Sequence, residues 1–137
     1  MINRRTVLTA AVALALAPGA ALAAQKTFYT PGSAERSLDA GKVVFLDFWT
    51  NWCTTCAAQN RVIERLRAEN PAYDRAITFI TVDWDKHAQG KLARDLRIPR
   101  RSTLVVMKGR TEIGRIVAGT RAADIKALLD AALAAAG

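Results

Sequence analysis

Residues 43–56 read Val-Val-Phe-Leu-Asp-Phe-Trp-Thr-Asn-Trp-Cys-Thr-Thr-Cys, so a nearly continuous apolar run leads to the only two cysteines of the chain. Such a run is typical of a strand inside a sheet that is covered on both faces. A helix that opens at the first cysteine would place free backbone N–H groups and a positive dipole end beside its thiol, and both favour the thiolate. We therefore predict a redox site in which Cys53 is the exposed, attacking thiol and Cys56 is the buried, resolving thiol.

Two other interpretations of a Cys-x-x-Cys pair are weaker here. A structural zinc site needs four ligands, and the rest of the chain offers a single histidine, His87, and no further cysteine. A structural disulfide across two intervening residues closes so short a loop that it removes little entropy from the unfolded chain. Thiol-disulfide exchange is therefore the chemistry that the pair favours.

The hydrophobic pattern on either side of the pair predicts alternating strands and helices. Strands are expected at residues 43–49, 77–82, 103–107 and 112–117, with a turn at 108–111, and helices at 33–38, 53–70, 85–96 and 122–135. This order implies an α/β domain whose mixed central sheet has a parallel half, an antiparallel hairpin and helices on both faces.

The first 23 residues have the three regions of a signal peptide. Two basic residues, Arg4 and Arg5, precede an apolar, alanine-rich run at 7–17, and a triplet of small residues follows at 21–23. The run is short for a membrane span, so we expect cleavage after Ala23 and export into an oxidising bacterial periplasm, with an uncleaved anchor as the minor alternative. The adjoining arginines fit a twin-arginine signal and an ordinary Sec signal about equally well.

Length and charge limit the classes of partner. The 137 residues carry a net charge of +8, and loss of residues 1–23 would leave 18 basic and 12 acidic side chains. The remaining length fits one domain, residues 24–137, which we expect to be monomeric. The basic residues are scattered and lack the motifs and interleaved aromatic residues of a nucleic-acid-binding protein, so no nucleic-acid partner is expected.

The element order and the stretch Asp-Phe-Trp-x-x-Trp-Cys-x-x-Cys at 47–56 resemble the thioredoxin family. The resemblance covers about residues 33–135 and implies a thioredoxin-like fold and exchange with protein disulfides, without a cofactor. It implies that Asp47 is a buried acid beneath the second cysteine, where it assists deprotonation, and that Trp49 and Trp52 flank the site. The residue types alone also allow Asp47 to be a hydrogen-bonded strand residue and Trp52 to be a surface packing residue.

Several positions depart from the usual pattern of the family. The family often has a proline between the cysteines, a lysine after the second cysteine and a lysine that pairs with the buried acid, where this chain has Thr54-Thr55, Ala57 and Thr81. In these respects the chain resembles periplasmic TlpA-like and DsbD-type domains more than cytosolic thioredoxin. The resemblance implies a periplasmic reductase that a membrane electron donor keeps reduced, although the Thr-Thr dipeptide leaves redox potential, direction and substrate open.

The family also has a cis-proline opposite the cysteines, just before the strand expected here at 103–107. Counting back from that strand without a gap places Ser102 at the cis-proline position. The alternative places Pro99 at that position and needs three extra residues before the strand. We favour Ser102. In that register Arg100 and Arg101 are expected either to line the substrate groove or to be two charges of an exposed loop. A serine in cis costs about 2.5–4 kcal/mol, which indicates either a strained or a trans peptide. Ser102→Pro is expected to give a more ordinary loop for the family.

A serine beside two thiols also suggests a different class of function. This alternative is a periplasmic module that binds a soft metal such as copper through Cys53 and Cys56. Because no cluster of methionine or histidine accompanies the cysteines, we expect no resident metal and keep this as the second hypothesis. Titration with cuprous ion, compared with reduction of insulin disulfides, separates the two.

Overall fold

The computed structural model describes residues 25–137, so the signal peptide predicted at 1–23 lies outside the described residues. The strands are β1 (Val43–Trp49), β2 (Ile77–Asp83), β3 (Thr103–Lys108) and β4 (Thr111–Val117). The helices are α1 (Ser33–Asp39), α2 (Thr54–Glu69), α3 (Ala72–Ala76), α4 (Trp84–His87), α5 (Lys91–Asp95) and α6 (Ala122–Ala136). The expected α/β class is confirmed.

The strands form one mixed sheet in the order β2-β1-β3-β4. β1 runs parallel to β2 and antiparallel to β3, and β3 and β4 form a hairpin. Two residues separate the paired Lys108 and Thr111, and Gly109 takes the positive φ of 59° that such a short turn favours. β1 is buried from Val43 to Phe48, as expected of a central strand.

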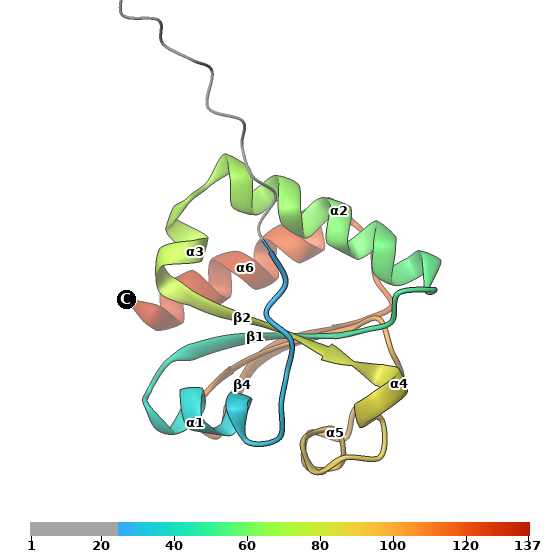
Figure 1. The fold of residues 1–137 in the computed structure, drawn as a ribbon. Helices are drawn as coiled ribbons and strands as arrows, with labels where there is room; N and C mark the ends of the chain where they lie inside the picture. Colours follow the sequence, from blue (N-terminus) through green and yellow to red (C-terminus); the bar gives the residue numbers. More distant parts are fainter. Residues whose placement is uncertain (1–24) are drawn as a thin grey trace, which may run out of the picture.

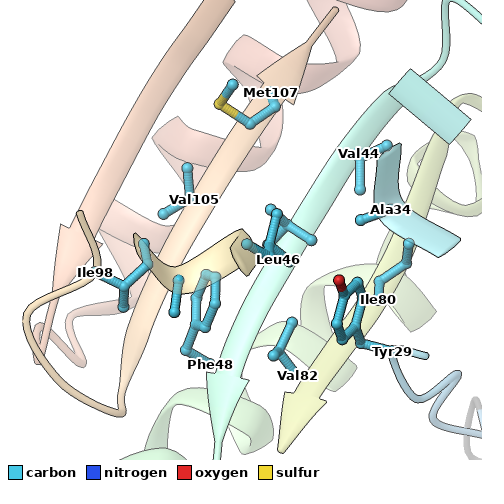
Figure 2. Packing of buried hydrophobic residues seen from close by; sticks show 12 residues of the cluster. Tyr29, Ala34, Val44, Leu46, Phe48, Ile80, Val82, Ile98, Val105 and Met107 are labelled. Carbon is cyan, nitrogen blue, oxygen red and sulfur yellow. The ribbon is translucent and has the colours of Figure 1, made fainter. Parts of the chain in front are cut away.

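Helices cover both faces of the sheet: α2, α3 and α6 lie on one side, and α1, α4 and α5 lie on the other (Figure 1). Because successive side chains of a strand point to opposite faces, β1 contributes to two separate hydrophobic cores. Val44, Leu46 and Phe48 pack on the side of α1 and α5 (Figure 2). Val43 and Phe45 pack on the side of α2 and α6. The end of β1 is therefore held from both sides.

Two segments differ from the expected elements. The helix expected at 85–96 is instead the two short helices α4 and α5, because the chain leaves helical geometry at Gly90, which has φ −76° and ψ 169°. Glycine loses more conformational freedom in a helix than any other residue. Pro71 follows α2, as expected, but it also starts α3, since a missing N–H is tolerated in the first turn of a helix. The remaining strands and helices are confirmed to within one or two residues.

The segment before α1 adds a contact with the sheet that was not predicted. Phe28 forms a parallel bridge with Thr81 of β2, in which Tyr29 N–H donates to Thr81 O and Thr81 N–H donates to Thr27 O, each at 2.8 Å. The segment thereby covers part of an open sheet edge and brings Lys26 to the site described below. Among residues 25–137, each helix falls short of the length and apolar character needed to cross a membrane.

Candidate active site

The two cysteines lie at the start of α2, after the loop that follows β1. Cys53 is the N-cap residue, with an extended backbone (φ −85°, ψ 115°). Its Sγ accepts a hydrogen bond from Cys56 N–H at 3.2 Å. One of the free N–H groups of the helix start therefore points at this thiol, as the sequence predicts, and no disulfide joins the pair.

The two thiols differ in burial and in acidity. Cys56 has no exposed surface and Cys53 retains 6%, so the expectation of an exposed Cys53 is wrong; the Ser102 loop packs against it. Burial alone would raise the pKa of Cys53, but hydrogen bonds from Cys56, Ser102 and Arg101 outweigh it and lower that pKa to about 7. Burial raises the pKa of Cys56, and the hydrogen bond with Cys53 adds to the rise. Cys53 is therefore the more acidic and the more accessible thiol.

Ser102 faces both thiols. Its Oγ lies 3.1 Å from Cys53 Sγ and 3.1 Å from Cys56 Sγ, and the residue has no exposed surface. The structure thus places Ser102 opposite the cysteines, whereas Pro99 is an exposed loop residue. All peptide bonds of residues 25–137 are trans, and Ser102 has a positive φ of 62°. This backbone does not suit proline, which fixes φ near −65°, so the structure argues against the expectation that Ser102→Pro gives a more ordinary loop.

A buried glutamine holds the Ser102 loop in place. Gln59 lies in the second turn of α2 without exposed surface, and its Nε2 donates to Ser102 O and to Gly119 O, each at 2.9 Å. Ser102 N–H donates to Phe48 O at 2.7 Å, and Ala118 N–H donates to Ser102 O at 2.8 Å. These hydrogen bonds fix the left-handed backbone of Ser102 against β1, α2 and the segment after β4.

One side chain links Asp47 to the backbone of Cys56. Asn60 Nδ2 donates to Asp47 Oδ2 at 3.1 Å and to Cys56 O at 2.8 Å. Burial raises the pKa of Asp47 from 3.8 to about 6, while the charge of Lys26 and the Asn60 hydrogen bond act in the opposite direction. The other carboxylate oxygen, Oδ1, is buried and has no hydrogen-bond partner among residues 25–137. A carboxylate of this kind can accept a proton near neutral pH.

Lys26 brings a positive charge to this acid from the segment before α1. Its Nζ donates to Asn60 Oδ1 and lies 5.5 Å from the centre of the Trp49 ring. Thr81, where the family resemblance suggests a lysine, instead binds the segment before α1 through its backbone. A pocket of about 210 Å³ lies beside Asp47 and is lined partly by Lys26 and Asn60.

The exposed Trp52 and the half-buried Arg101 form a rim beside the thiols. Trp52 is 57% exposed, and its Nε1 donates to Asp85 Oδ2 at 2.9 Å. The Arg101 guanidinium lies 4.3 Å from the centre of the Trp52 ring, in a cation–π contact. Arg101 also lowers the pKa of Cys53. The structure thus brings together all the residues predicted for the site: Cys53, Cys56, Asp47, Trp52, Arg101 and Ser102.

Three polar residues of the site were missed by the sequence reasoning. Gln59 and Asn60 lie three and four positions after Cys56, on the same face of α2, so helical spacing could have indicated them. Lys26 makes its contact with Asn60 across 34 positions of the sequence, for which no local signal exists. Within the described part of the chain, no group of three or more His, Cys, Asp or Glu side chains is placed to hold a metal ion.

Comparisons with known proteins agree on one family. The family model described as Thioredoxin matches residues 29–131. A thioredoxin of Mycolicibacterium smegmatis is 33% identical over 95 residues, which cover 69% of this chain and 82% of that protein. A thioredoxin of Malassezia sympodialis is 34% identical over 76 residues, which cover 56% of this chain and 69% of that protein.

Solved structures give the same result for the fold. Trxlp of Edwardsiella tarda superposes with a TM-score of 0.65 at 24% identity, and the match covers 76% of this chain and 98% of that one. The Malassezia sympodialis thioredoxin superposes with a TM-score of 0.61 at 25% identity, over 80% of this chain and 96% of that one. The expected thioredoxin-like fold is therefore confirmed.

Proposed function

The chain belongs to the thioredoxin family and is a thiol-disulfide oxidoreductase, and from this premise we propose that it reduces disulfides of exported proteins in the periplasm through Cys53 and Cys56. One observation carries the proposal. Cys53 is the N-cap residue of α2, its sulfur accepts a hydrogen bond from the backbone N–H of Cys56, and its pKa is about 7. Cys56 is fully buried one turn further along the helix.

In the proposed reaction Cys53 acts first. Its thiolate bonds to one sulfur of a substrate disulfide, and the other substrate sulfur leaves with the electron pair and takes a proton from water. Cys56 then loses its proton to Asp47 and attacks Cys53 Sγ, which breaks the mixed disulfide and releases the second substrate thiol. The enzyme ends with a Cys53–Cys56 disulfide, and the substrate has gained two electrons and two protons.

The acidity of Cys53 supports the reducing direction. Reducing Cys-x-x-Cys proteins have a nucleophile with a pKa of about 7, whereas strong oxidants have one of about 3.5 because their reduced form is stabilised. The pKa of Cys53, about 7, lies at the reducing end of this range. We expect a reduction potential nearer to about −270 mV than to about −120 mV.

Export is supported by the sequence of residues 1–23, which has the regions of a signal peptide. Thr54-Thr55, Ala57 and Thr81 add a resemblance to periplasmic TlpA-like and DsbD-type domains. A reductase in an oxidising compartment needs a supply of electrons, so the proposal includes a membrane protein as donor. It also includes protein disulfides as substrates, contacted by Trp52 and Arg101, and a monomeric enzyme.

Expression of the full chain in a bacterium with a periplasm tests the proposed function. The expected product is a periplasmic protein that begins at Ala24, reduces insulin disulfides with dithiothreitol as electron source, and has a potential in the reducing range. Cys53→Ser, exported in the same way, is the matched control and should not reduce insulin. A protein that stays in the cytoplasm with residues 1–23 still attached would contradict the proposed periplasmic location. Cuprous-ion binding without insulin reduction would favour the metal-binding alternative.

Replacing Asp47 with asparagine is expected to slow the second step and leave the first unchanged. The amide fills the same space but cannot take the Cys56 proton, so resolution should slow by about a hundredfold near pH 7, within the range for general-base catalysis. The two steps can be separated with the disulfide reagent DTNB, since attack by Cys53 and resolution by Cys56 each release one thionitrobenzoate. Asp39→Asn, which alters an exposed carboxylate of α1, is the control; equal second phases in both variants would make Asp47 a packing residue.

The same substitution is expected to stabilise the fold at neutral pH. The carboxyl of Asp47 ionises at an ordinary pKa of 3.8 in the unfolded chain and at about 6 in the folded one, so its buried charge destabilises the fold above pH 6. This cost is absent below about pH 4, and it corresponds to at most ~3 kcal/mol. Urea unfolding below pH 4 and above pH 6 should show that the free energy of unfolding of the wild type falls relative to that of Asp47→Asn as the pH rises.

A further inference from the structure

The Ser102 hydroxyl lies within hydrogen-bond distance of both reacting sulfurs. Its Oγ is 3.1 Å from each Sγ, on a residue without exposed surface. A hydroxyl has one hydrogen to donate and two lone pairs to accept. Donation from Ser102 would lower the pKa of Cys53 and also that of Cys56. A hydrogen shared between both sulfurs binds each one more weakly than a hydrogen aimed at one of them, so the question is which sulfur receives it in each step.

The negative charge changes sulfur during the reaction. In the reduced enzyme Cys53 is the thiolate and Cys56 keeps its proton, because its pKa is the higher of the two. In the mixed disulfide Cys53 is bonded to the substrate sulfur and carries no charge, and Cys56 must become the thiolate. The charge therefore moves from one side of Ser102 Oγ to the other.

We propose that Ser102 is a further catalytic residue, which donates its hydroxyl hydrogen to the Cys53 thiolate before attack and to the Cys56 thiolate during resolution. The proposal rests on the exchange through Cys53 and Cys56 proposed above. A rotation of the O–H bond is the only movement required, because the oxygen is equally distant from the two sulfurs. Hydrogen bonds to charged groups are stronger than neutral ones, so the hydroxyl stabilises whichever sulfur is ionised.

Resolution balances in bonds and protons without any proton from Ser102. The Cys56 S–H bond breaks and its proton passes to Asp47. A bond forms between Cys56 Sγ and Cys53 Sγ, and the bond from Cys53 to the substrate sulfur breaks. The electron pair of that bond leaves with the substrate sulfur, which then takes a proton from water.

Of the described side chains, only that of Ser102 has a hydrogen-bond contact with both sulfurs. Arg101 lowers the pKa of Cys53, and Asp47 is linked through Asn60 to the backbone oxygen of Cys56. The Ser102 oxygen lies between the two sides, and the hydrogen bonds from Gln59 and to Phe48 hold its backbone there. Its position therefore depends on buried contacts rather than on the substrate.

Removal of the hydroxyl in the full, exported chain tests the proposal. Ser102→Ala removes the hydroxyl and keeps the Cβ atom, and Ser102→Gly removes the hydroxyl and accepts the positive φ without strain. An effect that both variants share is therefore due to loss of the hydroxyl and not to a folding defect. In both variants the ultraviolet titration of the Cys53 thiolate should move upward by about one pH unit, as expected for loss of a hydrogen bond to a charged group. Below neutral pH both thionitrobenzoate phases should slow about threefold to tenfold, since the thiolate fraction falls more than the nucleophilicity rises.

The outcomes separate this proposal from the one on which it rests. A wild-type protein that lacks both phases would contradict the exchange through Cys53 and Cys56. With an active wild type, slowing of both phases in both variants supports the role of the hydroxyl. Slowing of the first phase alone would overturn it, because the hydrogen bond would then serve Cys53 only. Wild-type rates in Ser102→Gly would overturn it as well, because the backbone and not the hydroxyl would then matter.

Discussion

Replacing Cys56 with serine is expected to end turnover and to leave substrate proteins covalently bound to Cys53. Cys56 is the only other cysteine of the chain and the one thiol placed to attack a mixed disulfide on Cys53. A serine hydroxyl fits the same buried position but is not ionised near neutral pH, so the second step cannot proceed. Insulin reduction should fall to the rate of dithiothreitol alone, and non-reducing gels should show adducts with substrate proteins.

Cys53→Ser is the matched variant for this trap. It should lose turnover to the same extent, but it should form no adducts, because the attacking thiol is absent. Adducts on Cys53→Ser and none on Cys56→Ser would reverse the two roles. That result would also conflict with the fully buried position of Cys56 and the pKa of about 7 at Cys53.

Ser102→Pro is expected to destabilise the fold by about 3 kcal/mol or more. Ser102 has φ 62°, whereas the proline ring holds φ near −65°. Proline also lacks the N–H that Ser102 donates to Phe48 O at 2.7 Å inside the core, and leaving a buried carbonyl without its partner costs about 1–3 kcal/mol. Thermal unfolding should therefore show a fall in Tm on the order of 10 °C or more.

Ser102→Gly is again the control, because glycine keeps the N–H and accepts a positive φ. Its Tm should stay close to that of the wild type. If Ser102→Pro instead unfolds at the wild-type temperature and reduces insulin normally, the loop before β3 has a second, equally stable conformation, and the geometry described for Ser102 is not required.

The features with a local signal were predictable from the sequence. The apolar run of β1 and the cysteines after it determine where α2 begins, and Gly109 indicates the hairpin turn. The cis-proline position of the family, with a count of residues back from β3, was enough to place Ser102 at the site. The break at Gly90 was missed because one glycine costs a helix only about 1 kcal/mol, and the apolar spacing of Leu92 and Leu96 continues past it.

The features that depend on distant contacts could not be predicted. The burial of Cys53 depends on Ser102, 49 positions away, and Gln59 reaches carbonyls 43 and 60 positions away. A left-handed backbone at a serine has no pattern in the sequence, since it is held by these contacts and not by the residue itself. The same holds for Lys26, which reaches Asn60 because the segment before α1 pairs with β2.

The hydrogen bonds around Ser102 determine which parts of the site can move. Ser102 is buried, and its backbone is hydrogen-bonded to β1, to Gln59 of α2 and to Ala118 after β4, so it can move away only when the surrounding core opens. Trp52 is 57% exposed, and exposed side chains change rotamer in picoseconds to nanoseconds. Adaptation to substrates of different shape therefore falls to Trp52, while the sulfur geometry stays the same for every substrate.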